Sequence, residues 1–121
     1  MGYFLNVHEG PQVFNPTPNP VPVELGMITS VEPGIYRPGK HGIRIENLVN
    51  TIAAISNEFN EFYAFECLTI APISTKIVKK ELLEQAQVDW LNSYNALVFE
   101  KLSPLLTADE AAFLKEETKA I

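Results

Sequence analysis

Four side chains in this 121-residue sequence are of types that could do chemistry together: His8, Glu32, Arg44 and Glu46. His8 precedes a Gly-Pro turn, and a histidine can take up or release a proton near neutral pH. Glu32 follows an apolar-rich run and stands immediately before a Pro-Gly turn. Two carboxylates, a histidine and a neighbouring arginine suit a hard or borderline divalent cation that is bound through oxygen and nitrogen.

Each of these residues also has a plainer interpretation. Arg44 and Glu46 alternate with isoleucines, so in a strand they would share one face. A carboxylate among β-branched apolar residues is costly to bury unless it is paired or bound to a cation. Arg44 could supply that pair as well as a metal could. An ordinary ion pair on a sheet face and a hydrogen-bonded surface histidine at His8 therefore stay open as alternatives.

The elements that would position these residues are typical of antiparallel sheet between Glu24 and Lys79. Proline at every second position makes residues 15–22 an extended loop, because proline can pair neither in a helix nor in a central strand. Turn residues separate runs that are rich in β-branched and aromatic side chains. These runs predict strands at 3–7, 27–31 and 43–55, a turn at 37–40, and one or two further strands within 62–77.

The last part of the chain predicts two helices. Spacings of three and four give the first helix one apolar face, formed by Leu83, Ala86, Trp90, Tyr94 and Leu97. Pro104 would end this helix. Thr107 and Glu110 then predict a capping box at the start of a second helix, with Phe113 and Leu114 on its apolar side. A helix pair that follows a sheet places the chain in the α+β class.

Composition excludes several classes of function. The formal net charge of −6 argues against nucleic acid as a partner, since phosphate-binding surfaces are basic. No apolar run approaches the roughly 20 residues that span a bilayer, so no membrane partner is expected. The single cysteine, Cys67, excludes an internal disulfide and fits a reducing compartment, which predicts a cytoplasmic location.

Three motifs in order resemble the pita-bread metallopeptidases, and most closely the cytosolic type of Xaa-Pro aminopeptidase. They are residues 4–11, the Glu32-Pro33-Gly34 motif with Tyr36, and residues 42–47. Residues 68–69, 72–73 and 89–92 resemble the C-terminal extension of that subgroup. The resemblance implies that residues 1–79 are the C-terminal part of a pita-bread catalytic domain and that residues 80–121 are a helical C-terminal extension.

The resemblance also implies an activity. Members bind two divalent metal ions, commonly manganese, and use a metal-bound hydroxide to remove the N-terminal residue from peptides with proline in the second position. By resemblance, Glu32 is a metal ligand that also transfers protons, and Glu46 bridges both metals. His8 corresponds to a histidine that contacts the substrate or the tetrahedral intermediate. Arg44 corresponds to an arginine that packs near the metal carboxylates.

The sequence departs from the family in its ligand set. The two aspartates and the histidine that complete the metal site in the family would lie upstream of Met1, so the chain is expected to be inactive by itself. The resemblance further implies a homodimer in which the C-terminal extension takes part. Two alternatives stay open: a pita-bread domain that binds partners without metal or peptidase activity, and an unrelated α+β interaction domain.

Overall fold

A computed structural model describes residues 7–121 of the chain, which forms two compact units that divide between Thr69 and Ile70. The predicted order of an antiparallel sheet followed by two helices is confirmed, and with it the α+β class. The strand expected at residues 3–7 lies outside the described residues except for Val7, which is in a bend. The expected boundary between a catalytic domain and its extension, at residues 79 and 80, stays a prediction.

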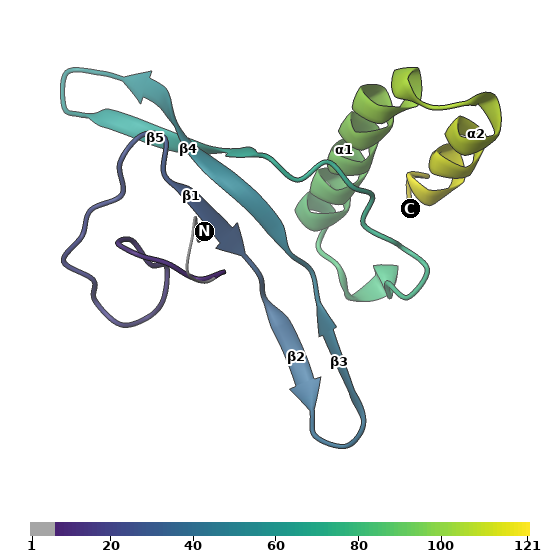
Figure 1. Cartoon of the computed structure of the whole chain (residues 1–121), viewed down its shortest axis with the longest axis horizontal. Coiled ribbons are helices and arrows are strands. Elements are labelled where there is room, and N and C mark those ends of the chain that lie inside the picture. The colour runs from purple at the N-terminus through teal and green to yellow at the C-terminus, as the bar shows by residue number, and fades with distance from the viewer. Residues whose placement is uncertain (1–6) are drawn as a thin grey trace. The chain divides into compact units, whose positions relative to one another are not determined.

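The first unit contains two antiparallel sheets (Figure 1). In the three-stranded sheet, β4 lies between β1 and β5, and in the other sheet β2 pairs with β3. The strands are β1 Ile28–Val31, β2 Gly34–Arg37, β3 His41–Arg44, β4 Asn47–Ser56 and β5 Glu61–Cys67.

The turn that was predicted at residues 37–40 closes the β2–β3 hairpin. Gly39 has a φ of 69°, which favours glycine, and the Lys40 N–H donates to the Arg37 carbonyl at 2.9 Å. Along the hairpin, the Tyr36 side chain covers two glycines. A Cβ atom would come within 2.8 Å of Tyr36 at Gly34 and within 2.7 Å at Gly42. Glycine at both positions therefore lets the tyrosine ring lie flat on the ribbon.

The stretch predicted as one strand over residues 43–55 is divided in the structure. β3 ends at Arg44 and β4 begins at Asn47, so Ile45 and Glu46 lie between the two strands. The reason lies on the opposing segment, where Pro33 has no N–H to donate. The Pro33 carbonyl still accepts from the Ile45 N–H at 3.3 Å, so the segments stay adjacent across the interruption.

Within residues 62–77 the structure contains one strand, β5, and the alternative of a second strand there is wrong. Beyond Cys67 the Leu68 N–H still donates to the Leu48 carbonyl of β4 at 2.8 Å, and farther along the chain is irregular, with backbone groups that bond to side chains. The Ile73 N–H and C=O both pair with the side-chain amide of Asn95, at 3.0 and 3.1 Å. The Ala71 carbonyl accepts from the Tyr94 hydroxyl at 2.9 Å.

The second unit is helical. Its elements are the 3₁₀ turn η1 Lys80–Leu82, α1 Gln85–Leu102, the 3₁₀ turn η2 Ser103–Leu105 and α2 Ala108–Glu117. The predicted end of the first helix before Pro104 is confirmed. The capping box is also confirmed: the N–H and the hydroxyl of Thr107 donate to the Glu110 carboxylate at 2.9 and 2.7 Å. Both bonds lower the pKa of Glu110, and the bond from the Thr107 backbone N–H contributes more than the bond from its hydroxyl.

The apolar face predicted for α1 is right at Tyr94, which is buried, but wrong in its rotation about the helix axis at other positions. Trp90 is 56% exposed and Leu97 is 37% exposed, although both were expected to face inward. The buried residues of α1 are Val88, Leu91, Tyr94, Asn95 and Val98. A polar residue decides the rotation, because the Asn95 amide must be buried where it meets its two backbone partners. On α2, Leu114 is buried as expected, but Phe113 is 67% exposed.

In residues 7–121, none of the helices combines the length and the apolar character needed to cross a membrane.

Replacing Asn95 with alanine is expected to lower the free energy of unfolding by about 2 kcal/mol, because two backbone groups of Ile73 lose their partners. Thermal or urea unfolding measures the change. Ser93→Ala, on an exposed position of the same helix, is the matched control and should change stability little. Equal stability of the Asn95 and Ser93 variants would contradict the role given to the Asn95 amide.

Candidate functional site

Glu32 and Glu46 lie at the interruption between the two sheets, directly opposite each other. On one side of the interruption Val31 faces Asn47, and on the other side Gly34 faces Arg44. Counting inward from either pair places Glu32 opposite Glu46, so the register continues unchanged through the gap. Residues directly opposite on antiparallel segments project from the same face. The fold therefore holds two carboxylates side by side.

Arg44 offsets the repulsion that two opposed carboxylates produce. Its Nη1 atom lies 2.7 Å from Oε2 of Glu32, and its Nε atom lies 3.7 Å from Oε2 of Glu46. The Glu32 side chain is 24% exposed, and the side chains of Arg44 and Glu46 are 47% and 39% exposed. Glu32 thus takes the shorter and less solvated of the two ion pairs. The ion-pair interpretation left open by the sequence is present, and it involves both glutamates.

Ser30 completes the surroundings of Glu32. It lies two residues earlier on the same extended segment, so both side chains project from the same face. The Ser30 hydroxyl donates to Oε1 of Glu32 at 2.9 Å. Each oxygen of this carboxylate therefore has one fixed donor, Ser30 on Oε1 and Arg44 on Oε2.

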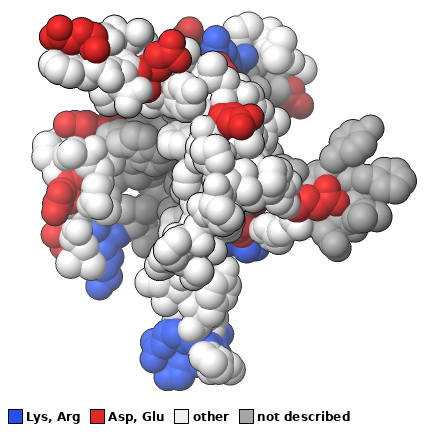
Figure 2. Space-filling view, turned by 90° about the vertical axis from the view of Figure 1, so that its left-hand side faces the viewer, with Lys and Arg blue, Asp and Glu red and all other residues white. Residues whose placement is uncertain are grey.

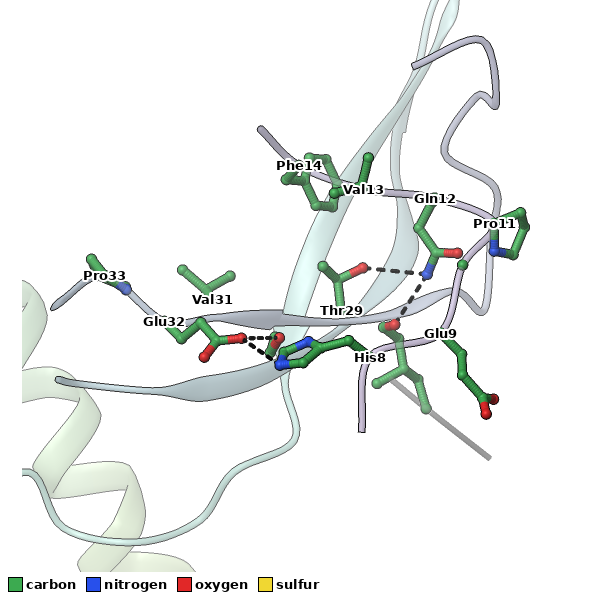
Figure 3. Close-up of a pocket in the computed structure, with 13 residues that line it drawn as sticks. His8, Glu9, Pro11, Gln12, Val13, Phe14, Thr29, Val31, Glu32 and Pro33 are labelled. Carbon is green, nitrogen blue, oxygen red and sulfur yellow. Dashed lines mark hydrogen bonds and ion pairs between the residues drawn. The ribbon is translucent and has the colours of Figure 1, made fainter. Parts of the chain in front are cut away.

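His8 approaches Glu32 from a loop that lies along β1. Its Nε2 atom is 3.8 Å from Oε1 of Glu32, and its side chain is 70% exposed. Gln12 fixes this loop, because its amide donates to the Ile28 carbonyl at 3.1 Å and contacts the Thr29 hydroxyl at 3.5 Å. Figure 3 shows the two contacts on opposite sides of the β1 ribbon, with His8 beside Glu32 on one side and Gln12 beside Thr29 on the other.

An open cavity of about 670 Å³ lies beside this loop, lined by residues 8–14 and 28–33. His8 and Glu32 stand on its wall, together with the apolar side chains of Val13 and Phe14. A largely apolar cavity with a few convergent polar groups is the usual form of a small-ligand site. The cavity gives Glu32 and His8 access to a bound molecule.

The four residues selected from the sequence thus form one chain of contacts in the order His8, Glu32, Arg44, Glu46. Sequence reasoning assigned no role to Ser30 or Gln12. A serine two residues before a strand-end glutamate was a usable signal for Ser30, because alternation places both on one face. No local pattern pointed to Gln12, whose partners lie 16 and 17 positions away.

The residues present fit part of a divalent-metal site. Carboxylate oxygens at Glu32 and Glu46 are suitable donors for a hard cation, and they face each other across the ladder. Within residues 7–121, however, no three side chains of histidine, cysteine, aspartate or glutamate converge as a complete ligand group. Further donors from outside the described residues would be needed to hold two ions.

The remaining basic residues of this unit are remote from the carboxylates. The hairpin turn carries Arg37 and Lys40, and Figure 2 shows basic side chains gathered at the lower tip of the molecule. Acidic side chains are spread separately over the rest of the face in that view. Of the described ion pairs, those of Glu32 are with His8 and Arg44.

Replacing Arg44 with methionine is expected to lower the free energy of unfolding by about 1 kcal/mol, because Glu32 and Glu46 would then face each other without a cation between them. Arg44→Lys should restore part of this loss. Urea unfolding at low and high salt measures both variants, and the difference should shrink as salt screens the charges. Arg37→Met, in the same hairpin, is the control. A loss of equal size in the control would contradict the bridging role of Arg44.

Comparison with known proteins covers the whole chain. Residues 1–52 match the family described as metallopeptidase family M24, and residues 61–121 match the C-terminal region of peptidase M24. Aminopeptidase P2 of Arabidopsis thaliana is 50% identical over 88% of this chain and 16% of its own length. A probable Xaa-Pro aminopeptidase P of Coprinopsis cinerea is 41% identical over 100% of the chain and 21% of its own length.

Among solved structures, an X-prolyl aminopeptidase from Caenorhabditis elegans, described as a cytosolic enzyme with a di-nuclear active site, is similar with a TM-score of 0.83. It is 38% identical, and the match covers 99% of this chain and 20% of that protein. The chain therefore spans about a fifth of the length of the relatives it matches.

Proposed function

This chain belongs to metallopeptidase family M24, and from that membership we propose that it is the C-terminal part of a longer Xaa-Pro aminopeptidase. Its architecture is the C-terminal part of the pita-bread fold, as the likeness to the C. elegans enzyme shows. The complete protein would remove the N-terminal residue from peptides that carry proline in the second position. The relatives' names and the family match support this substrate class.

The observation that carries the proposal is the pairing of Glu32 with Glu46 across an unbroken register. An interaction domain has no chemical need for two carboxylates held face to face, since the arrangement costs free energy unless a cation offsets it. Arg44 offsets part of it, and the free lone pairs of the carboxylates suit a further cation.

Two divalent cations are proposed for this site, and the carboxylates of Glu32 and Glu46 would be among the ligands that hold them. The di-nuclear site of the C. elegans enzyme supports the number of ions, and the choice of manganese rests on the family resemblance. Bound there, such ions supply Lewis-acid activation of water. Ligands missing from this chain would come from the remaining four-fifths of the complete protein.

The residues of this chain have distinct proposed roles in proton handling. Glu32 would accept the proton of the attacking water and return it to the proline nitrogen as the peptide bond breaks. The support is its place on the cavity wall with one oxygen directed toward His8. His8 would donate a hydrogen bond to the carbonyl oxygen as negative charge develops there. Arg44 would offset the electrostatic repulsion between the carboxylates of Glu32 and Glu46.

A cytoplasmic location is proposed for the complete protein. The single cysteine agrees with a reducing compartment, and the similar C. elegans protein is described as a cytosolic enzyme.

The test uses the complete protein loaded with manganese and a peptide with proline in the second position. Glu46→Gln is expected to lose metal and activity together, because a bridging ligand determines occupancy. His8→Ala should keep its metal and lose about 100-fold or more in kcat, as expected for a donor that acts in the transition state. Metal analysis and steady-state kinetics measure both.

Glu58→Gln, on an exposed loop of the same unit, is the matched control and should leave metal content and kinetics unchanged. The 121-residue chain alone should hydrolyse no such peptide, since it lacks a complete ligand group among its described residues. A complete protein that bound neither metal nor peptide substrate would favour the alternative, a pita-bread domain that acts as a binding module. Loss of metal in His8→Ala would contradict the role assigned to His8.

We further propose that the protein is a homodimer in which the helical unit takes part. Large apolar side chains stand exposed on that unit, among them Leu82, Trp90, Leu105 and Phe113. Exposed apolar patches of this kind usually mark interaction surfaces. Sedimentation of the 121-residue chain should show a dimer in the micromolar range, and Trp90→Lys should weaken it. A monomer at all concentrations would contradict the proposal.

A further inference from the structure

We propose that Ser30 is a positioning residue for Glu32, and that it keeps this carboxylate available to a cation instead of to His8. The inference rests on the proposed function, in which Glu32 is both a metal ligand and a proton carrier. Ser30 itself touches neither substrate nor metal in this proposal. It acts through the orientation of Glu32.

The two oxygens of Glu32 are held by donors of different kinds. The Ser30 hydroxyl bonds Oε1 at 2.9 Å, and the Arg44 guanidinium bonds Oε2 at 2.7 Å. The terminal torsion of a glutamate is broad and nearly two-fold, so a single donor leaves the plane of the carboxylate poorly defined. Donors on both oxygens fix that plane. An ionised carboxylate has about four acceptor positions, so roughly two stay free for a cation or a proton.

The bond from Ser30 also bears on His8. The His8 Nε2 atom lies 3.8 Å from Oε1, the same oxygen that Ser30 holds, which is too long for a hydrogen bond. Although Gln12 holds the loop, the His8 side chain is 70% exposed, so its ring has room to rotate toward Oε1. With Ser30 in place, Oε1 already has its donor on β1. Without the Ser30 hydroxyl, Oε1 would pair with His8. Glu32 would then be less available to a cation, and His8 would be less available to the substrate.

The position of Ser30 explains why a serine can do this. Ser30 lies within β1 and pairs with Leu48 of β4, so its backbone is fixed by the sheet. It projects from the same face as Glu32, two residues on. Its hydroxyl therefore reaches the carboxylate from a rigid strand, whereas Arg44 reaches it with a long and partly exposed side chain.

The test compares Ser30→Ala and Ser30→Thr in the complete protein. Outer groups that orient metal ligands typically contribute 10–100-fold to metal affinity or activity. Ser30→Ala is therefore expected to bind manganese about tenfold more weakly and to lose kcat by a similar factor, with KM nearly unchanged. Ser30→Thr keeps the hydroxyl and should retain both values. Calorimetric titration with manganese gives the affinity independently of turnover.

Two controls separate positioning from simple stability. Ser56→Ala removes a hydroxyl from the far end of β4 and should change neither metal affinity nor kcat. Valine has nearly the shape of threonine but no hydroxyl. If the alanine variant folds poorly, comparison of Ser30→Val with Ser30→Thr therefore isolates the effect of the hydroxyl at constant packing. Melting temperatures of all variants are measured alongside.

The inference would be overturned, and the proposed function left intact, if the threonine, valine and alanine variants all had the manganese affinity and kcat of the wild-type protein. A fall in melting temperature with unchanged affinity and kcat would also overturn it, because Ser30 would then serve stability alone. A wild-type complete protein without metal binding or peptide hydrolysis would overturn the proposed function itself, and the role of Ser30 with it.

Discussion

The first unit depends on one constraint: two carboxylates stand opposite each other on antiparallel segments without a change of register. Left alone, Glu32 and Glu46 would repel each other and weaken the pairing around them. Arg44 neutralises them from the adjacent position on the same face, at 2.7 Å from one and 3.7 Å from the other. The hairpin beyond the interruption therefore contributes the cation that the site requires, and its strands β2 and β3 place that cation.

The second unit has its own organising contact, and it too is polar. Asn95 is 1% exposed and bonds both backbone groups of Ile73, which gives that irregular segment the pairing that a neighbouring strand would otherwise provide. Burial of an amide is unfavourable without such partners, so this contact determines which face of α1 turns inward. Trp90, one of the largest apolar residues of the helix, is consequently left half exposed and stacks on Tyr94 with ring centroids 5.5 Å apart.

Local patterns in the sequence were sufficient for elements whose determinants are near neighbours. The turn at residues 37–40, the end of α1 before Pro104 and the capping box of Thr107 with Glu110 each depend on residues within a few positions. The rotation of α1 was predicted incorrectly, because hydrophobicity alone cannot reveal that a buried asparagine has partners 22 positions away. For the site, alternation predicted a shared face for Arg44 and Glu46, but the meeting of Glu32 with Glu46 needed the register of β1 on β4.

The continuous register also limits how this segment can change over evolutionary time. Successive side chains of an extended chain alternate between faces. The two arms of this ribbon are residues 31–37 and 41–47. One residue inserted in either arm would move one of the two glutamates to the opposite face. Arg37 and His41 form the last pair of the hairpin. Within this hairpin, insertions leave the register unchanged only in the exposed turn that joins these two residues. Related sequences should therefore differ in the size of that turn while the two arms keep equal lengths.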